Sequence, residues 1–271
     1  MSTASRFSKF HDNIVLTPNQ YSDAKTKCDS VCKALHRFYY PNQEYTGATK
    51  YIIGSYGKET AIRPPSDVDV IFKIPWATYE RFSKNKTGPR GLLNEVKTVL
   101  EKTFTTTEII KPNGMVVNVS FVSFNVEVLP AYEWSSVDQG TFQVADTSIG
   151  STSLPSLYDP SSSYNILTFP LLANNYGRWK KIDPKKEINE LDSSNARSNG
   201  NTKALIQMMK KWVTYCSVPI KSVAIERLIY EFMLTYAYYN KGAAYYDYMV
   251  RDFLLLLKRK RYSTIFYAGN K

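Results

Sequence analysis

The chain has 271 residues, of which 43% are hydrophobic and 22% are charged, so it can bury a sizeable core and global disorder is excluded. Lysine and arginine outnumber aspartate and glutamate by 35 to 24, and this net charge of +11 favours a polyanionic partner such as nucleic acid or nucleoside triphosphates. A basic soluble protein without such a partner is the plain alternative. The three cysteines give no disulfide framework, and the chain shows neither an apolar run of about 18 residues nor a signal peptide. We therefore expect a cytoplasmic protein with no membrane contact.

Helical and strand patterns alternate along the first half of the chain. Apolar and aromatic side chains at helical spacing predict a helix over about residues 17–40, which Pro41 ends. Residues 51–55 and 67–74 indicate two strands joined by a proline-containing turn, and residues 91–104 return to helical spacing. Three short strands are expected next, over residues 105–110, 115–122 and 124–132. This order predicts a mixed sheet with helices beside it.

The second half changes character. Residues of roughly 135–182 are rich in Ser, Asn, Gly and Pro and are interpreted as surface loops. Four helices are expected after them, over residues 185–199, 201–216, 221–239 and 245–261. We therefore predict an α+β, bilobal protein: an α/β core with an N-terminal helix over residues 1–170, packed against a helical domain over residues 171–271. The chain ends soon after its last helix, which leaves open whether a terminal helix is absent.

Two aspartates interrupt the apolar segment "GSYGKETAIRPPSDVDVIF", which spans residues 54–72. Asp67 and Asp69 share one face of the predicted strand, because residues two apart point the same way, and Val68 and Val70 share the other. Two carboxylates side by side repel each other unless a cation lies between them. The spacing therefore indicates a cation site at this strand.

A third carboxylate, Glu127, stands in the apolar run "FNVEVLPAY", where a strand would be buried. Three carboxylates on neighbouring strands are able to hold two Mg²⁺ ions, which prefer hard oxygen ligands and assist in-line displacement at phosphorus. At the start of the segment 54–72, Gly54 lets the backbone approach a phosphate, and the Ser55 hydroxyl is a hydrogen-bond donor for that phosphate. A lone Asp-x-Asp at an exposed strand end would mean little. The combination favours metal-dependent nucleotidyl transfer, with an inactive relative as the alternative.

The segment 54–72 resembles the signature of the polymerase-β-like nucleotidyltransferases, in which Gly-Ser and a spacer precede Asp-x-Asp. Most of residues 45–255 resemble the bacterial cGAS/DncV-like nucleotidyltransferases with a SMODS-type domain, through "GLLNEVKTVL", "VEVLPAY", "LIQMMKKW" and "KSVAIERLIYEFM". The resemblance implies a polymerase-β-like fold with residues 1–170 as the catalytic core. It implies an enzyme that joins nucleoside triphosphates into cyclic di- or trinucleotides, which activate an effector protein in anti-phage defence.

The resemblance also implies roles for single residues. The implied ligands of a two-metal site for Mg²⁺ or Mn²⁺ are Asp67, Asp69 and Glu127. Lys210 falls where the family has a phosphate-binding lysine, although a solvated helix face is the alternative. Ser222 falls where the family has a serine near the triphosphate, and a serine at a helix N-terminus suits anion binding, although it also suits a plain N-cap. Tyr132, just after the third acidic strand, is a candidate platform for a base, although most aromatic residues belong to the core.

Two other patterns favour ordinary structural roles. Cys28, Cys32 and His36 share one helix face, but a structural zinc site usually takes four ligands from separate elements, so we interpret the cysteines as buried thiols. The basic run that ends at Arg261 fits a solvated helix end better than a nucleic-acid contact. Activation by nucleic acid is therefore not expected, and neither is an oligomer. The functions left open beside cyclic synthesis are template-independent synthesis of linear oligonucleotides or extension of RNA, and nucleotide binding without catalysis.

Overall fold

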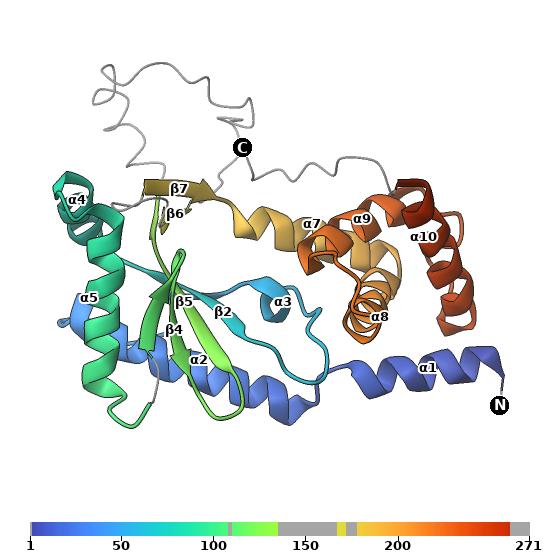
Figure 1. The fold of residues 1–271 in the computed structure, drawn as a ribbon, viewed down its shortest axis with the longest axis horizontal. Coiled ribbons are helices and arrows are strands. Elements are labelled where there is room, and N and C mark those ends of the chain that lie inside the picture. The colour runs from blue at the N-terminus through green and yellow to red at the C-terminus, as the bar shows by residue number, and fades with distance from the viewer. Residues whose placement is uncertain (1, 108–109, 135–166, 172–177, 261–271) are drawn as a thin grey trace, which may run out of the picture.

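The computed structural model describes residues 2–107, 110–134, 167–171 and 178–260. Its strands form one mixed sheet, which lies beside a group of helices (Figure 1). The strands are β1 (Lys50–Ile52), β2 (Val68–Lys73), β3 (Ile110–Asn113), β4 (Val116–Ser120), β5 (Asn125–Glu133), β6 (Leu167–Leu171) and β7 (Arg178–Ile182). The order is β1-β2-β5-β4-β3, with β6 paired to both β5 and β7. Paired strands are antiparallel except for β2 and β5, which are parallel.

The alternation of side chains along β2 determines on which face of the sheet Asp69 lies. Val68 and Val70 are fully buried in the main core. Helices α2 (Pro18–Tyr39) and α5 (Gly88–Thr103) pack on that face of the sheet (Figure 1). Because the side-chain period of a strand is two, Asp69 points to the opposite face, away from these helices.

Local signals explain where the helices of the core begin. Thr17 and Gln20 form a capping box before α2, and Pro18 stands at its first turn, where a missing N–H costs nothing. The predicted helix over 17–40 is therefore confirmed. The helix expected from residue 91 begins earlier, at Gly88, with proline again in its first turn.

The helical part of the chain has its own core. It contains α7 (Pro184–Arg197), α8 (Asn201–Tyr215), α9 (Ser222–Thr235), η1 (Ala243–Tyr245) and α10 (Tyr246–Lys260). Side chains such as Leu205, Ile229 and Phe253 are fully buried there. The N-terminal helix α1 (Thr3–Ile14) contacts α8, η1 and α10, and Ile14 joins their core (Figure 1). The expected bilobal α+β architecture is confirmed, whereas the domain boundary at residue 170 stays a prediction.

The structure corrects the expected elements in three places. The strand expected over 105–110 is wrong at residues 105–107, whereas residues 108–109 lie outside the described residues. Strand β3 covers Ile110–Asn113, and a two-residue turn with Gly114 in the left-handed region joins it to β4. Pro112 is tolerated because β3 is an edge strand. The interpretation of 135–182 as loops is wrong at β6 and β7, and the rest of that range lies outside the described residues. Helices α1 and α4 (Trp76–Lys84) were not expected from the sequence.

Candidate active site

Gly54 lies directly against the carboxylate of Asp69. Its φ is +61°, and a Cβ added there would stand 2.0 Å from Oδ2 of Asp69. Next to it, the backbone N–H of Ile53 donates to the carbonyl of Asp69 at 3.0 Å. Both the backbone conformation and the close approach therefore require glycine at position 54.

The pairing of β2 with β5 brings Asp69 and Glu127 together. The two are register partners, and Asn118 of β4 is the partner of Glu127 on its other side. Burial raises the pKa of Asp69, and the interaction with the Glu127 side chain offsets part of that rise. Burial and the charges of Asp69 and Asp67 raise the pKa of Glu127 to about 7.

Asp67 lies just before β2 and is exposed. Its Oδ1 accepts hydrogen bonds from Nδ2 and the backbone N–H of Asn125, at 3.0 Å and 3.4 Å. Its charge still raises the pKa values of Asp69 and Glu127, behind the larger effect of burial. The structure thus brings two of the three predicted carboxylates into contact and leaves the third nearby, with one oxygen turned toward Asn125.

The donor chemistry of this site suits a divalent cation. In the part of the chain that the structure describes, no three or more His, Cys, Asp or Glu side chains are arranged to hold a metal ion. The paired carboxyl groups of Asp69 and Glu127 nevertheless supply hard oxygen donors, and their pKa values are raised because burial outweighs the positive charge nearby. A bound cation would add the positive charge that favours their ionised forms. Asp67 would join it by giving up its hydrogen bonds to Asn125.

Residues 54–61, named here the 54–61 segment, start with the short helix α3 (Gly54–Gly57) and turn back on themselves. The carbonyl of Ser55 accepts hydrogen bonds from the N–H groups of Thr60 and Ala61, at 2.8 Å and 3.1 Å. Ser55 itself is half-buried, directly after the glycine that touches Asp69. The predicted Gly-Ser pair is thus next to the acidic site.

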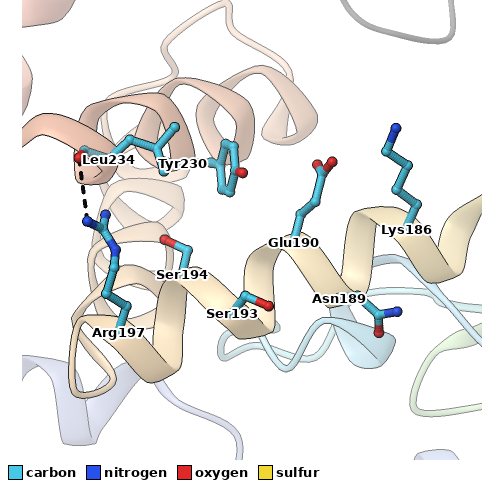
Figure 2. Close-up of a pocket in the computed structure, with 8 residues that line it drawn as sticks. All are labelled: Lys186, Asn189, Glu190, Ser193, Ser194, Arg197, Tyr230 and Leu234. Atoms are coloured by element: carbon cyan, nitrogen blue, oxygen red, sulfur yellow. Dashed lines mark hydrogen bonds between the residues drawn. The ribbon is translucent and has the colours of Figure 1, made fainter. Parts of the chain in front are cut away.

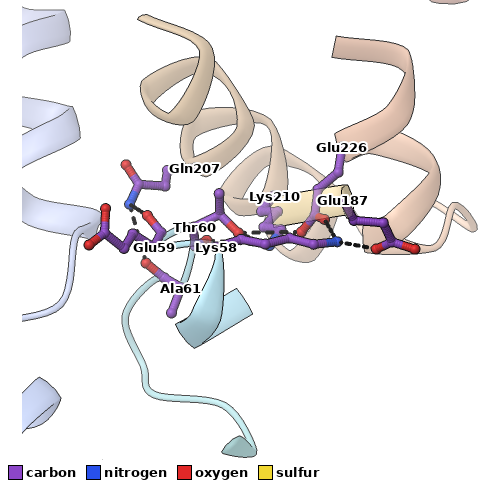
Figure 3. Close-up of polar contacts among 8 residues, drawn as sticks. All are labelled: Lys58, Glu59, Thr60, Ala61, Glu187, Gln207, Lys210 and Glu226. Atoms are coloured by element: carbon purple, nitrogen blue, oxygen red, sulfur yellow. Dashed lines mark hydrogen bonds and ion pairs between the residues drawn. The ribbon is translucent and has the colours of Figure 1, made fainter. Parts of the chain in front are cut away.

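Lys210 is buried on α8 and reaches the same segment (Figure 3). Its Nζ lies 2.6 Å from Oε1 of Glu226 and donates to the hydroxyl and the carbonyl of Thr60, at 2.9 Å and 3.3 Å. Lys210 is therefore not on a solvated helix face, the alternative given by the sequence. A role in phosphate binding stays a prediction.

Ser222 is the first residue of α9 and is exposed, while Lys221 occupies the N-cap position. Ser222 lies one turn before Glu226, so the side chains of Ser222 and Glu226 share a face of the helix. That face is directed toward the 54–61 segment, because Glu226 accepts a hydrogen bond from Thr60 at 3.3 Å. The predicted role of Ser222 near a triphosphate also stays a prediction.

Tyr132 lies within an aromatic cluster at the end of β5. Its ring stacks on Tyr79 with a centroid distance of 5.1 Å and an interplanar angle of 19°, and it also contacts Trp76 and Trp134. It is 7% exposed. Its prediction as a base platform stays open, and stacking there would require a rearrangement of this cluster.

The cysteines on α2 are confirmed as buried thiols. Burial raises the pKa of Cys28 to about 12 and raises that of Cys32 further. The ring nitrogens of His36 are hydrogen-bonded to Oγ1 of Thr49 at 3.2 Å and the carbonyl of Gln43 at 3.1 Å. Cys28, Cys32 and His36 are therefore buried residues with a structural role.

A groove of about 450 Å³ runs between α7 and α9 (Figure 2). It is lined by residues such as Lys186, Ser193 and Tyr230, and none of the predicted site residues is among those that line it in the described structure. Arg197 at its end donates to the carbonyl of Met233 and so ties α7 to the last turn of α9. We assign this groove no part in the acidic site.

Lys58 and Glu226 are the polar residues of this region that the sequence reasoning missed. Glu226 is 9% exposed and lies between Lys58 and Lys210 (Figure 3). The available signal was a glutamate within the apolar helix "SVAIERLIYEF", at a position that helical spacing assigns to the core. Which lysines it would meet depends on how α9 packs against the 54–61 segment.

Comparisons with known proteins identify the family of the chain. Residues 1–156 match the Second Messenger Oligonucleotide or Dinucleotide Synthetase domain, SMODS. The chain belongs to this family. A probable cyclic nucleotide synthase of Bacillus cereus (strain VD146) is 21% identical over 216 residues, which cover 72% of this chain and 59% of that protein. The chain thus spans less than two thirds of this curated relative.

Solved structures show the same polymerase-β-like fold. CdnC of E. coli MS115-1 with ATP superposes with a TM-score of 0.63 at 17% identity, over 99% of this chain and 75% of that chain. The di-nucleotide cyclase DncV of Vibrio cholerae, in complex with GTP and 5MTHFGLU2, gives a TM-score of 0.64 at 11% identity, over 92% and 76%. At these identities the likeness establishes the fold, and the predicted fold class is confirmed. None of the helices within the described ranges has the length and apolar character needed to cross a membrane.

Proposed function

We propose that the chain is a cyclic-oligonucleotide synthase that joins nucleoside triphosphates and releases pyrophosphate. The observation that carries this proposal is the contact of Asp69 with Gly54 on one side and Glu127 on the other. It places paired carboxyl groups beside a backbone that a phosphate group is able to approach. Membership of the SMODS family supports the cyclic product.

In the proposed reaction the ribose hydroxyl of one nucleotide attacks the α-phosphorus of another. The new P–O bond forms as the bond to pyrophosphate breaks, and Glu127, ionised when a cation is bound, accepts the hydroxyl proton. Two Mg²⁺ or Mn²⁺ ions, held by Asp67, Asp69 and Glu127, would supply charge stabilisation to the attacking and leaving oxygens. Gly54 and Ser55 orient the triphosphate through backbone and hydroxyl groups. A second transfer of the same kind closes the ring.

The remaining predicted residues have supporting roles in this proposal. Lys210 supplies positive charge beside the 54–61 segment, where a triphosphate would lie. Ser222, at the start of α9, offers a hydroxyl and the free N–H groups of a helix N-terminus. Tyr132 stays a candidate for base stacking through its aromatic cluster. The substrates are nucleoside triphosphates, and the enzyme acts as a monomer without activation by nucleic acid.

The biological role proposed for the product is that of a second messenger. It would activate an effector protein in bacterial defence against phage, in the cytoplasm. Family membership and the name of the Bacillus relative support a cyclic nucleotide as the product. The defence role rests on the resemblance of the sequence to the cGAS/DncV-like group.

The first test is release of pyrophosphate from each of the four nucleoside triphosphates, alone and mixed, with Mg²⁺ or Mn²⁺. The proposal predicts release by the wild-type chain and none by the double variant Asp67→Asn, Asp69→Asn. Asp192→Asn, which alters an exposed carboxylate on α7, is the control and should remain active. Nucleotide binding without any release would instead support a binding module, the alternative from a different functional class.

A further inference from the structure

A buried cluster of charges joins the 54–61 segment to the helical part of the chain (Figure 3). Glu226 of α9 binds Lys210 through Oε1 at 2.6 Å and Lys58 through Oε2 at 3.0 Å. Burial would raise the pKa of Glu226, but the two lysines lower it below the usual value. The carboxylate is therefore ionised and shared between two ammonium groups.

The two lysines differ in their remaining donors. An ammonium group has three N–H donors. Lys210 directs them to three acceptors: the hydroxyl of Thr60, the carbonyl of Thr60, and Glu226. Lys210 is therefore saturated, and it fixes the 54–61 segment to α8 and α9. It contributes positive charge to the region without a donor to spare.

Lys58, in contrast, has a donor to spare. Among the residues that the structure describes it has two acceptors, Glu226 and Glu187, each at 3.0 Å. The Glu187 side chain is 59% exposed, so water or a ligand is able to replace it, while the Glu226 side chain is 10% exposed. Burial alone would lower the pKa of Lys58, but both carboxylates together raise it, so the ammonium is charged.

Lys58 is also next to the proposed triphosphate site. Its backbone N–H donates to the carbonyl of Gly54 at 3.0 Å, and Gly54 is the residue that touches Asp69. Its charge lowers the pKa of Asp69, although burial has the larger effect and the pKa stays raised. A phosphate chain bound along Gly54 and Ser55 would thus meet the Lys58 ammonium.

We propose that Lys58 is a direct phosphate-binding residue of this site and that Glu226 is its positioning residue. Glu226 holds Lys58 through one oxygen and Lys210 through the other, and Lys58 exchanges its bond to Glu187 for one to the substrate. This inference rests on the proposed function. It adds that Lys58 contacts the phosphates, whereas Lys210 fixes the 54–61 segment to α8 and α9.

The test compares equilibrium binding of the four nucleoside triphosphates with that of the matching monophosphates, in Mg²⁺, by titration calorimetry. Lys58→Ala should weaken triphosphate binding by about 10- to 100-fold, the worth of a charged hydrogen bond, with a much smaller effect on monophosphates. Lys58→Arg should recover part of the loss. Glu226→Gln keeps the shape of the side chain and should also weaken triphosphate binding selectively, because the lysine is no longer held.

Lys203→Ala is the matched control. Lys203 likewise bridges two carboxylates, Glu59 of the 54–61 segment at 2.8 Å and Asp192 of α7 at 2.7 Å, and its side chain is 13% exposed against 12% for Lys58. Thermal unfolding of each variant records any loss of folding separately. A purely structural role for Lys58 would make the two alanine variants equal in triphosphate affinity.

Selective loss in the Lys58 and Glu226 variants, with Lys203→Ala close to wild type, would support the proposal. Equal losses for Lys58→Ala and Lys203→Ala, or equal losses for tri- and monophosphates, would overturn it while leaving the proposed function intact. A wild-type chain that binds no triphosphate better than its monophosphate would overturn both.

Discussion

Gly54 and Asp69 are packed so closely that a single added carbon would collide with the carboxylate, at 2.0 Å from Oδ2. The contact joins the start of the 54–61 segment to β2, and it brings the backbone that we propose to receive phosphate next to the carboxyl group that we propose to hold a cation. Neither residue would have this role alone.

Gly54→Ala should abolish product formation and lower stability by more than backbone strain alone. Gly114 provides a matched control, because it has the same φ of +61° but nothing within 4 Å of an added Cβ. We expect Gly114→Ala to cost about 1–2 kcal/mol from the left-handed backbone and to keep full activity. Urea unfolding and pyrophosphate release measure both quantities. Equal stability losses, or an active Gly54→Ala, would show that the contact with Asp69 has no consequence.

Asp67→Asn combined with Asp69→Asn should remove synthesis without unfolding the protein. Burial and mutual repulsion raise the pKa of Asp69, so the metal-free protein should be at least as stable after the change. Adding Mg²⁺ should raise the melting temperature of the wild type and leave that of the double variant unchanged. Synthesis at the wild-type rate by this variant would remove Asp67 and Asp69 from the reaction.

The metal-free protein should lose stability as pH rises through the neutral range. Glu127 has a pKa of about 7 in the folded chain against an ordinary 4.5, so the folded state holds this proton more tightly than the unfolded state does. The cost of ionising Glu127 therefore grows between pH 4.5 and about 7 and persists above it. Glu127→Gln should flatten that part of the profile.

Chemical unfolding in EDTA from pH 5 to pH 8 measures this effect. Glu101→Gln, which alters a surface carboxylate paired with Lys97 on α5, should keep the wild-type profile. Identical profiles for the wild type and Glu127→Gln would contradict the pairing of Glu127 with Asp69.

Lys210→Ala should destabilise the fold, because it leaves Glu226 with fewer positive partners inside the protein. Removal of one partner of a buried ion pair costs about 3–5 kcal/mol, and Lys58 should keep the loss near the lower value. The double variant Lys210→Ala, Glu226→Ala should lose less than the sum of the two single changes. Strict additivity in urea unfolding would mean that the two side chains do not interact in solution.

Strand alternation alone was sufficient to predict that Asp69 lies on the opposite face of β2 from Val68 and Val70. The contact between Asp69 and Glu127 could be predicted from the sequence only in part, because it depends on the parallel register of β2 and β5, which are far apart in the sequence. Lys58 and Glu226 were missed for the same reason: their contact requires α9 to pack against the 54–61 segment. Local patterns specify faces and helix ends, whereas contacts between distant elements depend on tertiary packing.

Helix α1 and strand β3 illustrate tertiary effects on secondary structure. The sequence of α1 is largely polar, and the helix lies against α8 and α10, where Ile14 is buried. Pro112 argues locally against a strand, yet the edge position of β3 accommodates it. In both cases the deciding information lies in neighbouring elements.

The most direct test of the central claim is the product formed from all four labelled nucleoside triphosphates with Mg²⁺ or Mn²⁺, treated with phosphatase and separated by chromatography. A cyclic-oligonucleotide synthase yields a phosphatase-resistant species that is absent with Asp67→Asn, Asp69→Asn and with Gly54→Ala, and single-label reactions then identify its bases. Products that phosphatase degrades fully, or linear chains added to RNA, would contradict cyclic synthesis and assign the same acidic site to a linear nucleotidyltransferase.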